Sequence, residues 1–162
     1  MVEKGQRTEV VPRPAAALRG NSLATVDGGG RLKLPSVFRR ALEDNWGSDL
    51  YLTSLEGDCL WLYPLTVWRR KEERLLALDR RHRALAKFVA RTSYFGAEAR
   101  LDGQGRVLVP PVLRPLARVA GEVAVLGALD HLEVWNNARF VARLKRDPLS
   151  RGDYQALAEL GF

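Results

Sequence analysis

The sequence has few residues of the kinds that form disulfides, metal sites and catalytic centres. Its 162 residues include one cysteine, Cys59, and two histidines, His82 and His131. A single cysteine permits no internal disulfide, and the apolar neighbours of Cys59 indicate a buried, unreactive thiol. Neither histidine has a partner at the spacing of a metal site or a catalytic triad, and no pair of carboxylates stands out. We therefore expect no enzyme activity, no metal and no cofactor.

A secretory signal and an apolar run long enough to cross a membrane are also absent from the sequence. We expect a cytoplasmic protein, with neither a membrane nor a small-molecule substrate as its partner. Hydrophobic residues make up 46% of the chain, which fits a folded protein. Lys and Arg outnumber Asp and Glu by 26 to 19, a net charge of +7. This excess favours a polyanionic partner, most simply nucleic acid, although charge alone defines no fold.

One nine-residue segment occurs twice in the chain. Residues 27–35 read DGGGRLKLP and residues 102–110 read DGQGRVLVP, so that five of nine positions are identical. Two further positions exchange Leu for Val. The copies begin 75 positions apart, so the duplication spans nearly the whole chain. A repeat of this kind indicates a fold built from two similar halves.

Each copy predicts a strand, a tight turn, a second strand and a short helix. The glycines after the Asp permit the positive φ angles of a tight turn. Pro35 and Pro110 end the second strand and suit the first turn of a helix. Apolar residues follow both prolines at helical spacing: Val37, Phe38, Ala41 and Leu42, then Val112, Leu113, Leu116 and Ala117. Pro115 falls inside the second helix and is expected to loosen or shorten it.

The Asp and the Arg of each copy have two compatible interpretations. In the structural one, the carboxylate accepts N–H groups of the turn and pairs with the Arg. In the functional one, the turn presents a guanidinium group outward to a phosphate or to the edge of a guanine. One motif alone favours the structural interpretation. Its duplication on a basic chain favours the functional one.

With these motifs the sequence resembles the MraZ family of bacterial regulators, which are built from two AbrB-like swapped-hairpin halves, each with an Asp-x-x-x-Arg motif. The matching residues of the first half are Asp27, Gly30, Arg31, Leu34, Pro35, Phe38 and Arg39. Those of the second half are Asp102, Gly105, Arg106, Val109, Pro110, Leu113 and Arg114, followed by residues 126–127 and 133–135. The resemblance covers roughly residues 18 to 145.

The resemblance implies an α+β fold, a double-repeat swapped-hairpin β-barrel with flanking helices. It also implies a sequence-specific DNA-binding transcriptional regulator, associated with the nucleoid, that assembles into a homo-oligomeric ring. Such a protein would act as a repressor on tandem promoter repeats of the division and cell-wall gene cluster. Two alternatives remain: an antitoxin-type module, and an oligomeric scaffold that does not touch DNA.

The residues expected to bind double-stranded DNA come from the two turns and the strands that follow them. They are Arg31, Arg106, Lys33, Gly30, Gly105 and Gln104, with Asp27 and Asp102 supporting the motifs. Each Arg is expected to project from its turn toward a base, and Lys33 toward a phosphate.

Three segments describe the expected organisation. Residues 1–17 are expected to form a flexible arm, residues 18–92 the first half with a long helix over about 65–90, and residues 93–162 the second half. The many basic residues of the long helix indicate a solvated face rather than DNA contact. Its apolar stripe is too extensive for one small domain to cover, so we expect self-association.

Further elements are expected from the remaining patterns. Strands are expected at residues 50–52, 60–63, 123–126 and 132–135, with turns at 56–58 and 128–130. A helix is expected from 137 to 145. Asp147 and Pro148 are expected to be the N-cap and the first residue of a last helix.

Overall fold

The structure, a computed structural model, describes residues 17–162; the expected arm lies outside the described residues except for Ala17. The first repeat contains β1 (Asn21–Val26), β2 (Arg31–Lys33), α1 (Ser36–Asn45), β3 (Asp49–Thr53), β4 (Leu60–Pro64), α2 (Leu65–Leu76) and α3 (Arg83–Tyr94). The second contains β5 (Ala97–Arg100), β6 (Arg106–Leu108), α4 (Leu113–Ala117), β7 (Gly121–Gly127), β8 (Leu132–Asn136), α5 (Asn137–Arg146) and α6 (Arg151–Glu159). The expected boundary at residues 92 and 93 falls in the last turn of α3.

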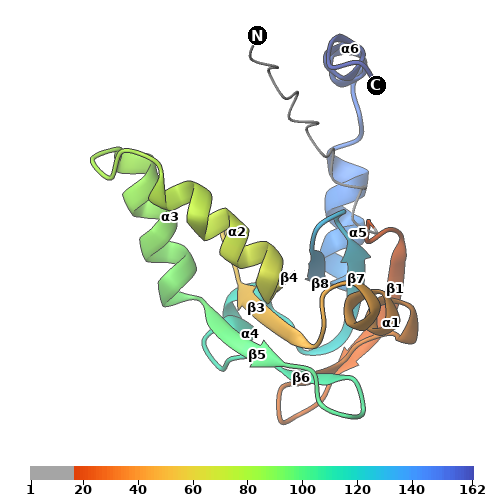
Figure 1. The fold of residues 1–162 in the computed structure, drawn as a ribbon. Coiled ribbons are helices and arrows are strands. Elements are labelled where there is room, and N and C mark those ends of the chain that lie inside the picture. The colour runs from red at the N-terminus through yellow and green to blue at the C-terminus, as the bar shows by residue number, and fades with distance from the viewer. Residues whose placement is uncertain (1–16) are drawn as a thin grey trace, which may run out of the picture.

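The described strands form one antiparallel sheet in the order β5-β3-β4-β8-β7-β1-β2-β6. Its two end strands, β5 and β6, are consecutive in the chain, and the turn between them is closed by the N–H of Asp102, which donates to the carbonyl of Arg106 at 2.9 Å. The sheet therefore curls into a nearly closed barrel from which helices extend (Figure 1). The expected α+β barrel with flanking helices is confirmed.

The two repeats exchange strands within this barrel. The first strand of each repeat pairs along its length with the third strand of the other, β1 with β7 and β5 with β3. The second strands pair with each other, β2 with β6, and so do the fourth strands, β4 with β8. A pseudo-two-fold axis thus passes between β2 and β6 and, across the barrel, between β4 and β8. Each Asp–Arg turn joins two strands whose main partners belong to the other repeat.

A single apolar core fills the barrel, because alternate residues of each strand face inward. Leu32 and Val107 oppose each other across β2 and β6 and are buried. The helix α1 inserts Phe38 and Leu42 into this core, and α4 inserts Leu113. Burying a side chain of this size stabilises the fold by about 1.5–3 kcal/mol. The core draws on both repeats, so neither half has a core of its own.

The prediction of one long helix over residues 65–90 is wrong, because two helices, α2 and α3, occupy this region. The Asp79 carboxylate accepts the N–H of Arg81 at 3.0 Å, and the ring of His82 accepts the N–H of Ala84 at 3.3 Å. These side chains compete with helical hydrogen bonds and start a new helix. As a result α2 and α3 fold into a hairpin that extends away from the barrel (Figure 1).

The start expected for the last helix is also wrong. Its N-cap is Ser150, whose hydroxyl accepts the N–H of Asp153, while the Asp153 carboxylate accepts the N–H of Ser150 at 2.7 Å. This reciprocal capping box outweighs the Asp147-Pro148 signal. The preceding helix is confirmed as α5, and α4, with Pro115 inside it, has 5 residues against 10 in α1. No helix among residues 17–162 is both long and apolar enough to cross a membrane.

Candidate nucleic-acid interface

The two Asp–Arg turns have the same backbone hydrogen bonds. In the first, one Asp27 oxygen accepts the N–H groups of Gly29 and Arg31 at 2.9 and 2.8 Å. In the second, one Asp102 oxygen accepts the N–H groups of Gln104 and Arg106 at 2.8 and 2.9 Å. In both turns the N–H of the Asp also donates to the carbonyl of the Arg. Each carboxylate therefore holds its own turn closed, as the structural interpretation of the motif requires.

These hydrogen bonds also stabilise the charged form of each carboxylate. The backbone N–H of Arg31 is the main cause that lowers the pKa of Asp27 below its ordinary value. The N–H of Arg106 does the same for the pKa of Asp102, and the Arg106 side chain lowers it further. Both turns thus carry a negative charge beside their arginines at neutral pH.

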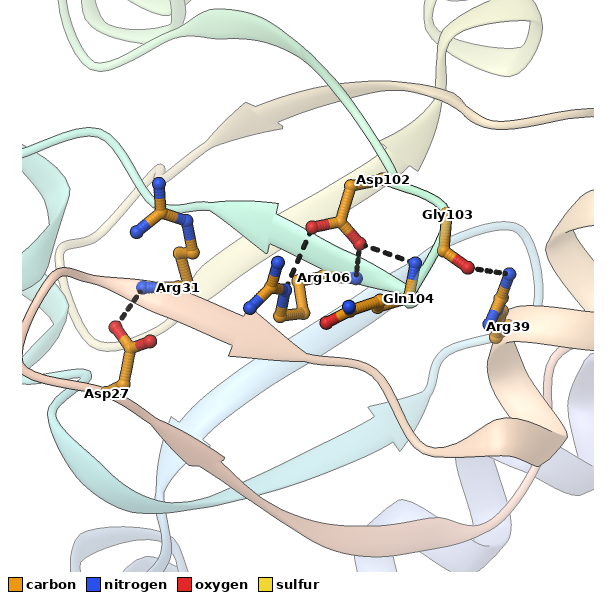
Figure 2. Close-up of polar contacts among 7 residues, drawn as sticks. All are labelled: Asp27, Arg31, Arg39, Asp102, Gly103, Gln104 and Arg106. Atoms are coloured by element: carbon orange, nitrogen blue, oxygen red, sulfur yellow. Dashed lines mark hydrogen bonds and ion pairs between the residues drawn. The ribbon is translucent and has the colours of Figure 1, made fainter.

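The arginine side chains of the two turns differ. The Nε of Arg106 donates to the second oxygen of Asp102 at 2.9 Å, which forms an ion pair. The guanidinium group of Arg31 makes no hydrogen bond or ion pair to any other residue within the range 17–162. Figure 2 shows this group directed away from Asp27, whose carboxylate lies against the backbone of the turn. Within the described part of the chain, the Arg106 side chain is therefore held by a carboxylate and the Arg31 side chain is not.

Each turn is also held by the other repeat. The carbonyl of Gly30 accepts the N–H of Val109 at 2.8 Å, and the carbonyl of Gly105 accepts the N–H of Leu34 at 2.9 Å. Both glycines are buried and have positive φ angles of 80° and 74°, which side chains disfavour. Through these hydrogen bonds the two buried glycines fix the turns against the other repeat. Direct contact of either glycine with DNA stays a prediction.

Two further arginines, one from each short helix, pack on these glycines. A Cβ at Gly30 would collide with the guanidinium group of Arg114, and a Cβ at Gly105 would lie 2.6 Å from Cδ of Arg39. Arg39 also donates to the carbonyl of Gly103 at 3.0 Å, as Figure 2 shows. Sequence reasoning missed this role. The signal was present, since both arginines follow the motif Arg by eight residues in both copies.

The strands after the turns form one basic surface, because β2 and β6 pair side by side. Arg31 lies opposite Leu108, and Lys33 lies opposite Arg106. Opposed residues of an antiparallel pair share a face, with Cβ atoms about 4.5–5.5 Å apart. We call the outward face of Arg31, Lys33, Arg106 and Leu108 the basic ribbon face. Both repeats contribute to it.

The basic ribbon face accumulates like charges that the fold itself does not require. Adjacent cations at opposed positions of a sheet are destabilising, and only Arg106 has an acidic side-chain partner there within the described chain. Gln104 is exposed at the tip of the second turn, where the first turn has Gly29. The structure brings the sequence-predicted side chains Arg31, Lys33 and Arg106 together on the outward face of β2 and β6, with Gln104 in the adjoining second turn. A surface of this kind can bind phosphates and base edges.

Comparison with known proteins gives the class and the family. The family described as "MraZ protein, putative antitoxin-like" matches residues 17–89 and 96–157. Transcriptional regulator MraZ of Acidobacterium capsulatum is 41% identical over 144 residues, which are 89% of this chain and 99% of that protein. The proteins of the same name from Koribacter versatilis and Deinococcus radiodurans are 38% and 40% identical, over 89% and 74% of this chain and 99% and 82% of their own lengths. These relatives are transcriptional regulators. The chain belongs to the MraZ family, as its resemblance implied.

Proposed function

We propose that the protein binds double-stranded DNA sequence-specifically through the basic ribbon face. The observation that carries the proposal is the convergence of Arg31, Lys33 and Arg106, from two repeats 75 residues apart, on one exposed surface. The net charge of +7 and the transcriptional regulators among the relatives support it.

The shape of the surface fits this role. The major groove of DNA admits a two-stranded β-ribbon, and β2 with β6 is such a ribbon. An Arg at this position can donate two hydrogen bonds to a guanine, and Lys33 can contact a phosphate. The ion pair with Asp102 holds Arg106 ready for a base edge, whereas Arg31 has to be ordered when DNA binds.

One basic ribbon face contacts few base pairs, so we propose that several act together in a homo-oligomeric ring. Tethering raises the effective concentration of the next binding surface, which favours tandem repeats in the DNA. We further propose that the protein is a repressor of the division and cell-wall gene cluster, located on the nucleoid in the cytoplasm. The alternatives are an antitoxin-type module and a scaffold without DNA binding.

Fluorescence anisotropy with DNA from the chain's own upstream region tests the proposal. A scrambled duplex is the control, and both are titrated between roughly 50 and 200 mM salt. We expect tighter binding to the upstream DNA and an affinity that falls steeply with salt, since each phosphate contact adds about −0.9 to the slope of log K against log salt. Binding that is absent, or equal for both duplexes at every salt concentration, contradicts the proposal.

Lys33→Ala sharpens this measurement. If Lys33 contacts a phosphate, its loss makes the salt slope shallower by roughly one unit and leaves the preference for the upstream DNA unchanged. Arg40→Ala, at an exposed Arg of α1 outside the basic ribbon face, is a control of equal charge. Equal slopes for wild type and Lys33→Ala would remove Lys33 from the proposed contact.

A further inference from the structure

Among residues 17–162, the last helix, α6, buries none of its side chains against the rest of the fold. It is 9 residues long and stands apart from the barrel at the end of α5 (Figure 1). Tyr154 is 60% exposed and Leu160 is 83% exposed, and both lie with Leu157 along one side of the helix. An isolated helix of this length is marginally stable in water, and its capping box provides only a local hydrogen-bond pair. Its apolar side is therefore available to pack against another surface.

A concave apolar surface of suitable shape lies on the α2–α3 hairpin. An open groove of about 500 Å³ runs between the two helices, and its apolar lining consists of Leu75, Leu76, Leu85, Ala86 and Val89. Leu76 is 65% exposed in this groove. An amphipathic helix that lays its apolar side into a groove between two helices is a recurrent mode of recognition. The groove is concave and apolar, and the apolar side of α6 is of the kind that such a groove accommodates.

Their charges are complementary too. The hairpin, residues 65–94, carries nine Lys and Arg against three Asp and Glu, a net charge of +6. The segment around α6, residues 147–162, carries three Asp and Glu against one Arg, a net charge of −2. Glu72 and Arg80 are the charged residues that line the groove, and Glu159 at the end of α6 is opposite in charge to Arg80. Opposite charges at the rim of an apolar contact favour the encounter and select the orientation.

The positions of the two surfaces determine which copy supplies the helix. The α2–α3 hairpin follows β4, and α5 with α6 follows β8. Because β4 and β8 are antiparallel neighbours, the two helical extensions leave from opposite ends of this strand pair. Figure 1 shows them diverging from the barrel. We propose that α6 of one copy docks into the α2–α3 groove of a second copy.

This inference rests on the proposed self-association and names the surfaces that produce it. A helix given by one copy and a groove offered by the next form a head-to-tail interface, which closes into a ring or extends as a filament. The interface uses the helices that follow β4 and β8, on the opposite side of the barrel from β2 and β6. Every copy in the assembly therefore keeps its basic ribbon face free for DNA.

Two full-length variants test the interface. One carries Tyr154→Gln with Leu160→Lys on α6, and the other carries Leu76→Glu with Val89→Glu in the groove. These side chains are exposed in a single copy, so both variants are expected to keep their fold, which circular dichroism checks. Val37→Asp is the matched control, because Val37 is 60% exposed on α1 and belongs to neither surface.

Analytical ultracentrifugation gives the readout, which does not depend on DNA binding. We expect oligomers for the wild type and for the control, and a mass of 18.1 kDa for each variant alone. An equimolar mixture of the two variants is expected to form a dimer of twice that mass, because one keeps the groove and the other keeps α6.

Three other results would overturn the inference, each in its own way. A monomeric wild type overturns the proposed self-association as well. Oligomers that persist in either variant leave self-association standing and place the interface elsewhere. Monomeric variants whose mixture forms no dimer show that α6 does not exchange between copies.

Discussion

The two Asp–Arg turns have the same backbone hydrogen bonds and differ in the side-chain contacts of their arginines. Asp27 and Asp102 accept the same two backbone N–H groups in their turns. Only Asp102 also holds the side chain of its Arg, through the 2.9 Å contact with Arg106. A Cβ at Gly29 would lie 3.4 Å from Nη1 of Arg31, so the missing side chain there leaves room for the free guanidinium group.

The difference separates two tasks that the motif combines. Closing the turn needs the Asp and the positive φ of the Gly directly before the Arg, and both turns keep these. Orienting the guanidinium group needs a second carboxylate oxygen, which only the second turn uses. Ordering a free side chain on binding costs about 0.5–1.5 kcal/mol. We therefore expect Arg106 to bind as a preformed group and Arg31 as an adaptable one.

The largest effect on stability is expected from a substitution at Gly30, where Arg114 of the second repeat packs on the first turn. Gly30→Ala places a Cβ against the Arg114 guanidinium group at a residue with φ of 80°. The left-handed backbone alone costs a non-glycine residue roughly 1–2 kcal/mol, and we expect the free energy of unfolding to fall by about that amount. Urea unfolding followed by circular dichroism measures it.

Gly28→Ala is the control for this prediction. Gly28 lies in the same turn, its φ is not positive, and a Cβ there would have no neighbour within 4 Å. We expect a change within about 0.5 kcal/mol. If both alanine variants unfold at the same urea concentration as the wild type, the contact of the second repeat with the first turn is not a source of stability.

A smaller effect is expected from the carboxylates, and it should be unequal. Asp27→Ala and Asp102→Ala each remove an acceptor of two turn N–H groups, and both are expected to lower the midpoint of urea unfolding. The fall should be larger for Asp102→Ala, because it also frees Arg106. Equal midpoints for the two variants would mean that the Arg106 ion pair contributes nothing measurable.

The smallest effect is expected from pH. The pKa of Asp102 is lowered in the folded protein, chiefly by the N–H of Arg106, so its carboxylate contributes stability in full above the ordinary value of 3.8. That contribution is lost as the pH falls through the lowered pKa. The difference in urea midpoint between wild type and Asp102→Ala should thus be present at neutral pH and vanish in strong acid. A difference independent of pH would contradict the role of the charge.

Local features of the fold could be predicted from the sequence, and contacts between the repeats could not. The glycine turns and the strands around residues 56–58 and 128–130 follow from local rules and are present. The split between α2 and α3 was missed because helical spacing outweighed the capping by His82. Two local signals compete at the last helix, and the Ser150–Asp153 capping box outweighs the Asp147-Pro148 signal on which the prediction rests.

The basic ribbon face is likewise a contact between the repeats that could not be predicted from local sequence. The repetition of the motif singled out Arg31 and Arg106, but no local rule states that β2 pairs with β6. That pairing depends on the exchange of strands across the whole barrel, which a local pattern does not encode. The family resemblance implied a swapped-hairpin barrel, and the structure adds the pairing of β2 with β6. The packing of Arg39 and Arg114 on the turns depends on the same exchange.

The central claim is that the arginines of both turns bind DNA, and one series of affinities tests it most directly. Kd for the upstream duplex is measured for wild type, Arg31→Ala, Arg106→Ala and the double variant, with circular dichroism on each. Each single loss is expected to weaken binding by about 1–3 kcal/mol, roughly five- to 150-fold, and to reduce the preference over scrambled DNA. The double variant should lose that preference entirely while its spectrum stays unchanged. A folded double variant that binds the upstream duplex with the wild-type Kd and preference would contradict the claim.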